Sequence, residues 1–177
     1  NNNDDYDDCK EEDLFNPDKF PHLRYLKIEN NRIDDVSNLT DLEYLKLGRF
    51  NYTKDISKLT NLTYLDLHNT RINDLSKNVN LTNLTLRTHC KVRDISMLTK
   101  LKYLKLHDSK KITDISNLTN LLHLDLYSVW CAWCLPKLVN LTHLKLDNIN
   151  LSEGVAEPYD IDLSNLKKLT HLTLETI

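Results

Sequence analysis

Hydrophobic positions recur along the chain with a period of about twenty residues. The pattern Leu-x-x-Leu-x-Leu/Ile occurs eight times, and successive copies are 19, 20, 19, 20, 20, 20 and 28 residues apart. The copies open at Leu23, Leu42, Leu62, Leu81, Leu101, Leu121, Leu141 and Leu169. A unit of this length cannot bury its own apolar side chains, so the copies are expected to stack into a solenoid of equivalent units.

Within each unit, the alternation of apolar and polar residues predicts a short strand. In the third copy, Leu65 and Leu67 alternate with polar neighbours, so the two leucines face the interior and their neighbours face solvent. Ile72 and Leu75 then return the chain to the core before the next copy opens at Leu81. The strands of successive units are therefore expected to form one parallel sheet.

The segment that returns from one strand to the next carries a recurring Asp-x-Ser motif. It occurs at Asp35-Val36-Ser37, Asp55-Ile56-Ser57, Asp74-Leu75-Ser76, Asp94-Ile95-Ser96, Asp114-Ile115-Ser116 and Asp162-Leu163-Ser164. The oxygens of Asp and Ser accept hydrogen bonds from the free N–H groups that begin a short turn. About ten residues remain outside the strand and its flanks, too few for a full α-helix, so 3₁₀ turns and loops are expected there.

The consensus L-T-x-L-x-L-x-x-x-x-x-I-x-D-I-S-x-L-T-N resembles the leucine-rich repeat family over about 155 residues. It is most similar to the internalin-like and phosphatase-regulator-like subclasses, although units of 19 to 20 residues are slightly short for them. The resemblance implies an α/β, mostly β, solenoid with a curved parallel sheet on its concave face. It also implies that Asn31, Asn51 and Cys90 occupy the position where the family buries an Asn or Cys that bonds loop backbone.

Charge and composition suggest two regions. Residues 1–22 are expected to form an acidic N-terminal segment and cap, with Leu14, Phe15 and Phe20 covering the first repeat. Residues 23–177 are expected to form a leucine-rich repeat domain of eight units, the last incomplete. The first thirteen residues have a net charge of −6 and the remaining residues +3, so the whole chain has a net charge of −3. No apolar stretch approaches the roughly 20 residues that would span a bilayer, so no membrane insertion is expected.

The solvent-facing strand positions are the candidate binding surface, because the resemblance implies a concave face that binds proteins. Tyrosine is common at binding hot spots, since it buries a large area at low entropic cost. The alternative interpretation is that stacked tyrosines only stabilise the sheet. The predicted partner-binding residues are Tyr25, Tyr44, Tyr64, Tyr103, His123, His143, Lys46, Asp66, Lys105 and Tyr127.

The sixth unit departs from the consensus and is a second candidate surface. It has Cys134-Leu135-Pro136 in place of Asp-x-Ser, with Trp130 and Trp133 nearby. An alignment without gaps places Ala132 and Leu135 at the return positions, whereas a slip by one residue buries Cys131 and Cys134. In either register a tryptophan is expected to be partly exposed, so Trp130 and Trp133 are predicted to form a secondary partner-binding patch.

Other chemistry finds little support in the sequence. His123, His143 and His171 share a column at a spacing that a metal could bridge, but no second shell of carboxylates accompanies them, and no metal is predicted. The Cys131–Cys134 pair lacks the helix and βαβ context of redox sites, and no cofactor is predicted. Solvent-facing lysines alternate with aspartates, which disfavours nucleic acid.

No nucleophile and general base can be combined into a catalytic site from this sequence. The predicted function is therefore a non-catalytic protein–protein interaction module. One alternative is a structural subunit or spacer that contacts neighbours through its ends and the tryptophan patch; another is a thiol enzyme. Leu172 and Leu174 have no following unit in this sequence, so self-association or a capping subunit is expected at that end. The sequence leaves the cellular compartment undecided. Unpaired cysteines and the lack of a signal-peptide pattern slightly favour an intracellular location.

Overall fold

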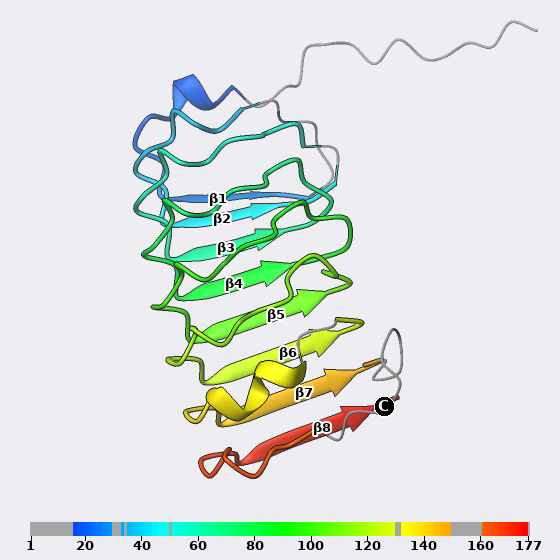
Figure 1. The fold of residues 1–177 in the computed structure, drawn as a ribbon. Coiled ribbons are helices and arrows are strands. Elements are labelled where there is room, and N and C mark those ends of the chain that lie inside the picture. Colours follow the sequence, from blue (N-terminus) through cyan, green and yellow to red (C-terminus); the bar gives the residue numbers. More distant parts are fainter. Residues whose placement is uncertain are drawn as a thin grey trace, which may run out of the picture.

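The computed structural model describes residues 16–29, 33, 35–49, 51–129, 132–149 and 161–176. Eight parallel strands form one sheet in chain order (Figure 1). They are β1 (Tyr25–Ile28), β2 (Tyr44–Leu47), β3 (Tyr64–Leu67), β4 (Asn83–Leu86), β5 (Tyr103–His107), β6 (His123–Tyr127), β7 (His143–Asp147) and β8 (His171–Glu175). Two 3₁₀ helices accompany them, η2 (Pro17–Lys19) and η3 (Ala132–Lys137). The described part of the chain contains no helix with the length and apolar character that crossing a bilayer requires.

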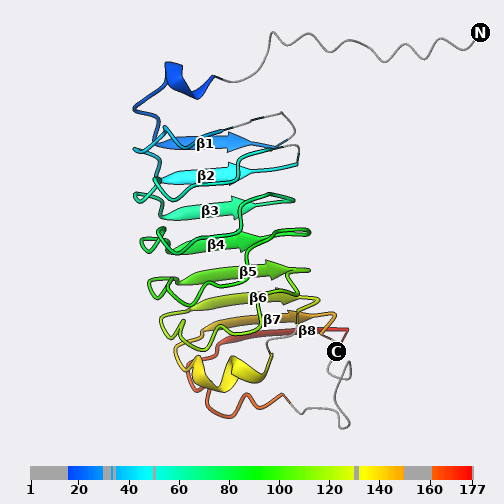
Figure 2. The same cartoon turned by 45° about the horizontal axis from the view of Figure 1, so that its top comes forward.

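Neighbouring strands pair at equivalent positions of the repeat. Tyr25 lies opposite Tyr44, and Tyr44 lies opposite Tyr64, while the core leucines pair in the same register. The strands therefore follow one another along the solenoid, as Figure 2 shows, and each repeat position becomes a column of stacked side chains. This arrangement confirms the solenoid and the parallel sheet that the sequence predicts.

The core consists of the apolar columns. In the third unit Leu62, Leu65, Leu67, Ile72 and Leu75 are all at most 1% exposed. Burying each such side chain contributes about 1.5–3 kcal/mol. Because a unit shares this apolar surface with both neighbours, stability depends on stacking.

The strand-entry edge is held by a ladder of side-chain hydrogen bonds. The amide of Asn80 donates to the carbonyl of Thr60 at 2.9 Å, and the hydroxyl of Thr82 donates to the carbonyl of Thr63 at 3.1 Å. Equivalent asparagine bonds recur at Asn61, Asn120 and Asn140. The Asn-Leu-Thr consensus is thus explained by the need to satisfy carbonyls of the preceding unit.

The return segments form the expected tight turns. In six units the serine N–H donates to the aspartate Oδ1 at 2.8 Å, as Ser57 does to Asp55. An i→i+3 backbone bond follows, in which Leu59 N donates to Ile56 O at 3.0 Å. The hydrogen bond from Ser57 holds the pKa of Asp55 below its ordinary value of 3.8. Within the described residues, continuous 3₁₀ helix occurs in η2 and η3.

The strand-exit edge turns through a left-handed residue after each strand from β3 onward. These residues are Asn69, His89, Asp108, Ser128, Asn148 and Thr176, with φ between 47° and 63°. The N–H of Asp108 donates to Tyr127 O at 2.9 Å, so this turn is bonded to the next unit. Beneath the turns, Cys90 Sγ donates to Leu67 O and Ser109 Oγ donates to Leu86 O, each at 3.2 Å. The buried column here satisfies strand carbonyls, as the resemblance implies for Cys90.

In the sixth unit, η3 replaces the Asp-x-Ser turn. Cys134 and Leu135 are both fully buried, so residues favoured by each of the two alternative registers enter the core. A six-residue 3₁₀ helix turns the chain more tightly than an extended return, and this allows adjacent residues to face inward. Trp130, Cys131 and the side chains of Ala132 and Trp133 lie outside the described part of the chain.

The two ends of the sheet differ. Leu26 in β1 is 6% exposed, whereas Leu172 and Leu174 in β8 are 46% and 47% exposed. Of the predicted cap residues, Phe20 is half-exposed, while Leu14 and Phe15 fall outside the described residues. The division of the chain at residues 22 and 23 stays a prediction.

Candidate interaction surfaces

The side chains of the sheet that point away from the core leucines form the surface that we call the concave face; Asp66 and Thr85 on it are buried, although the alternation in the sequence predicts that they face solvent. The first column is Tyr25, Tyr44, Tyr64, Asn83, Tyr103, His123, His143 and His171; the second is Lys27, Lys46, Asp66, Thr85, Lys105, Asp125, Lys145 and Thr173; the third is Glu29, Gly48, His68, Arg87, His107, Tyr127, Asp147 and Glu175. Nine of the ten concave residues predicted from the sequence lie in the first two columns, and Tyr127 lies in the third.

Three tyrosines stack at the beginning of the first column. Ring centroids of Tyr25 and Tyr44 lie 4.1 Å apart, and those of Tyr44 and Tyr64 lie 4.2 Å apart. Burial between its neighbours, followed by hydrogen bonding with them, raises the pKa of the Tyr44 hydroxyl. Tyr25 remains 57% exposed, so stacking leaves aromatic surface open to solvent. Packing and exposure therefore coexist in this part of the column.

Three histidines stack at the other end of the same column. The centroid distances are 4.1 Å from His123 to His143 and 4.0 Å from His143 to His171. The Thr142 hydroxyl donates its only proton to Leu122 O at 3.0 Å, so it accepts from His143 Nδ1 at 2.9 Å. This bond places the proton of neutral His143 on Nδ1 and leaves Nε2 as an acceptor.

Stacking also determines what the histidines can bind. The ring planes of His143 and His171 differ by only 8°, so their in-plane lone pairs run nearly parallel and cannot converge on one ion. Within the described residues, no group of three or more His, Cys, Asp or Glu side chains is placed to hold a metal. The histidines form a polar aromatic surface instead.

The charged side chains of the concave face are joined in pairs and networks. Asp66 is 2% exposed and receives bonds of 3.1 Å from both Nε and a terminal nitrogen of Arg87. The hydrogen bond with Asp66 raises the pKa of the Arg87 guanidinium. Lys46 Nζ lies 3.8 Å from Asp66 and 2.5 Å from Glu29, extending the network to β1.

Ion pairs between cations and carboxylates extend over the whole concave face. Lys27 pairs with Glu29 at 3.3 Å, Lys105 with Asp125, and Lys145 with Glu175 at 3.1 Å. Every lysine and arginine of the three columns thus has a carboxylate partner. Neighbouring strands are about 4.8 Å apart, so alternating signs relieve the repulsion that like charges would suffer.

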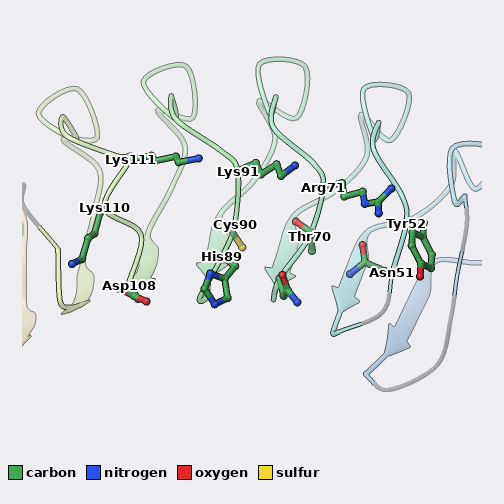
Figure 3. Close-up of a pocket in the computed structure, with 11 residues that line it drawn as sticks. Asn51, Tyr52, Thr70, Arg71, His89, Cys90, Lys91, Asp108, Lys110 and Lys111 are labelled. Atoms are coloured by element: carbon green, nitrogen blue, oxygen red, sulfur yellow. The ribbon is translucent and has the colours of Figure 1, made fainter.

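A groove of about 840 Å³ lies on the strand-exit edge beside β2 to β5 (Figure 3). We call it the strand-exit groove; it is lined by Asn51, Tyr52, Asn69, Thr70, Arg71, His89, Cys90, Lys91, Asp108, Lys110 and Lys111. The Arg71 guanidinium lies 4.8 Å from the centre of the Tyr52 ring. This groove is not predicted by the repeat pattern, although four basic residues close to the ends of three successive strands were a usable signal.

Cys90 in this groove is a structural residue. Its Sγ donates to Leu67 O, and burial raises the pKa of its thiol. A thiol held in the protonated form is a weak nucleophile. Cys134, the other cysteine within the described residues, is fully buried. The secondary patch predicted at Trp130 and Trp133 falls outside the described side chains and stays a prediction.

No known family profile matches the sequence, and no curated protein matches it. Solved structures of Listeria monocytogenes internalins do match. Internalin F is 23% identical, with 92% of this chain and 63% of that one covered and a TM-score of 0.54. Internalin C2 is 21% identical, with coverages of 85% and 80% and a TM-score of 0.50. The functional domain of InlJ is 20% identical, with coverages of 92% and 46% and a TM-score of 0.48.

The chain therefore has the leucine-rich repeat fold, and internalins F and C2 are similar to it in architecture. At 20% to 23% identity, this likeness concerns the fold and not the activity. The chain spans about half of the InlJ structure and 63% of the internalin F structure.

Proposed function

We propose that the protein is a non-catalytic interaction module that binds a protein partner through its concave face. The observation that supports this best is the stack of Tyr25, Tyr44 and Tyr64, which presents aromatic surface on a rigid sheet. Side chains already ordered by stacking lose little entropy on binding, and buried tyrosines are frequent hot spots. The fold shared with internalins supports a protein-interaction role in general terms.

The paired charges beside the tyrosines support the same surface. Lys46 is paired with Glu29 and Arg87 with Asp66, so a partner can cover these groups without leaving an isolated charge. The proposal assigns no catalytic step to any residue. The thiol of the strand-exit groove, Cys90, is hydrogen-bonded and has a raised pKa, which does not favour nucleophilic chemistry.

The test begins with a photocrosslinking amino acid placed at Tyr44 and, as a control, at the exposed Met97. A protein captured from Tyr44 and not from Met97 is purified, and its affinity is measured by calorimetry. The double variant Tyr44→Ala/Tyr64→Ala is expected to weaken binding by about 2 kcal/mol or more, roughly 30-fold. The control variant Val79→Ala/Met97→Ala, which removes exposed apolar surface elsewhere, is expected to bind normally. Unchanged affinity in the folded tyrosine variant would rule out this face.

A second candidate function is contact through the β8 end of the solenoid. Leu172 and Leu174 belong to core columns, yet they are half-exposed on the last strand of the sheet. A sheet edge that is unpaired in this sequence and carries exposed leucines is a site for self-association, for a covering subunit or for further residues of the protein. Light scattering should show association at tens of micromolar that Leu174→Lys reduces. A stable monomer with strong hydrogen-exchange protection in β8 would show that this end needs no cover.

A further inference from the structure

The strand-exit edge carries an uneven distribution of charge. Across residues 49–54, 69–73, 88–93 and 108–113, a single acidic residue, Asp108, accompanies seven basic ones. The basic residues are Arg49, Lys54, Arg71, Lys91, Arg93, Lys110 and Lys111. The whole chain has a net charge of −3, so this concentration of positive charge is not a consequence of composition.

The cations that line the strand-exit groove lack acidic partners. Arg71, Lys91, Lys110 and Lys111 form no ion pair with any carboxylate in the described part of the chain. Figure 3 shows Arg71, Lys91 and Lys111 in one row across neighbouring units. The groove lining thus carries four cations and a single carboxylate, Asp108, and a hollow with such an excess of one sign attracts a ligand of opposite charge.

Part of the groove is already held in place by contacts within the protein. Tyr52 supports the Arg71 guanidinium through a cation–π contact at 4.8 Å. The left-handed turn at Asp108 is bonded to the following unit, and Cys90, which also lines the groove, is hydrogen-bonded to Leu67 O. Such preorganisation lowers the entropic cost of binding.

We propose that the strand-exit groove binds an acidic, extended segment of a protein. The groove spans the exits of β2 to β5, which is three strand spacings or about 14 Å. An extended peptide advances about 3.3 Å per residue, so a stretch of four to six residues rich in Asp and Glu has the required length. This site lies on a different side of the units from the concave face and does not depend on the function proposed above.

The surroundings favour a short acidic peptide over nucleic acid. Beyond the groove, the segments that follow β6 and β7 (residues 128–131 and 148–152) contain no basic residue, so the positive surface is too short for a long polyanion. Three of the four cations that line the groove are lysines, which bind carboxylates as point charges. The ring of Tyr52 already supports Arg71, so it is a poor platform for stacking a base.

The experiment measures binding of a fluorescein-labelled hexaglutamate peptide to the full chain by fluorescence anisotropy. Saturable binding is expected, and the variant Arg71→Gln/Lys91→Gln/Lys111→Gln should weaken it at least about tenfold. The control Lys58→Gln/Lys77→Gln/Lys167→Gln removes the same charge from exposed return turns and should change affinity less than about twofold. The conservative variant Arg71→Lys/Lys91→Arg/Lys111→Arg should keep binding within about threefold, because the positive charge is preserved.

Three results would overturn the proposal. Equal losses in the groove and control variants, with native circular dichroism in both, would mean that the peptide senses only the overall charge. Tighter binding of a labelled six-nucleotide thymidine strand, lost in the groove variant, would assign the groove to nucleic acid. Absence of saturable peptide binding at 50 mM salt would also refute it.

Discussion

The concave face and the strand-exit groove are built from the same repeats but differ in whether their cations have carboxylate partners. On the concave face, Lys46, Lys105 and Lys145 each have a carboxylate partner. In the groove, Arg71 and Lys91 have none among the described residues. Both surfaces repeat every unit, so repetition alone does not decide which charges accumulate.

The difference follows from the spacing and solvation of the two surfaces. Concave side chains stand on strands about 4.8 Å apart, and Asp66 there is almost completely buried, so an unpaired charge would be costly. The groove cations Lys91, Lys110 and Lys111 are on exposed turns, where water and salt screen their repulsion. The first surface therefore gains rigidity from its charges, and the second retains a field that can attract a ligand.

The largest effect is expected from breaking the buried concave network. Asp66→Ala removes the carboxylate that binds both nitrogens of Arg87, and should lower the free energy of unfolding by about 2 kcal/mol. The value lies below that of a fully buried pair because Arg87 is 41% exposed and recovers solvation. Urea denaturation at pH 7 measures the change.

Asp125→Ala provides the matched control on the same face. Its side chain is 19% exposed and contacts Lys105, so a smaller loss of about 1 kcal/mol is expected. If Asp66→Ala costs no more than Asp125→Ala, burial does not govern the energetics of this network, and the contrast between the two surfaces loses its basis.

Neutralising the groove should have a much smaller effect on stability. The variant Arg71→Gln/Lys91→Gln/Lys111→Gln removes unpaired cations, so its free energy of unfolding should stay within about 0.5 kcal/mol of the parent. Raising salt from 20 to 200 mM should stabilise the parent more than the variant, because screening relieves a repulsion that the variant no longer has. A loss above about 1 kcal/mol would indicate that these side chains stabilise the fold and are not held free for a ligand.

Much of the fold was predictable because the sheet pairs equivalent positions. Leu45 lies opposite Leu65 and Tyr44 opposite Tyr64, so aligning the repeats was enough to place both columns. The stacked geometry of His123 and His143 was not predictable, since it depends on ring orientation and on the bond from His143 to Thr142. Their role in binding remains a prediction.

The groove escaped prediction because unit length varies at the strand exits. Two residues follow β3 up to the left-handed Asn69, whereas three follow β4 up to the left-handed His89. The left-handed turn accommodates the additional residue. Arg71 and Lys91 therefore line the same groove, although Arg71 is the fourth residue after its strand and Lys91 is the fifth. Likewise, η3 accommodates two adjacent inward residues, Cys134 and Leu135, which neither register anticipated alone.

The smallest expected effect concerns the three histidines that stack in the first column of the concave face. Burial, followed by the charges of His171 and His123, lowers the pKa of His143 below 6.5. The unfolded chain then takes up a proton at a higher pH than the folded protein does. The stabilising contribution of neutral His143 is complete above pH 6.5 and is lost as the pH falls through 6.5 toward the lowered folded pKa.

Titration of the imidazole Cε1 proton by NMR tests this difference directly. The midpoint of His143 should lie below 6.5 and should rise in His123→Asn/His171→Asn, which removes both neighbouring charges. Thr142→Val removes the acceptor for Nδ1–H of the neutral ring, and, unlike the double variant, leaves both neighbouring imidazoles in place. A parent midpoint at or above 6.5 would mean that stacking at 4.0 Å imposes no penalty on protonation, and that even this uncompensated part of the concave face is as well solvated as the groove.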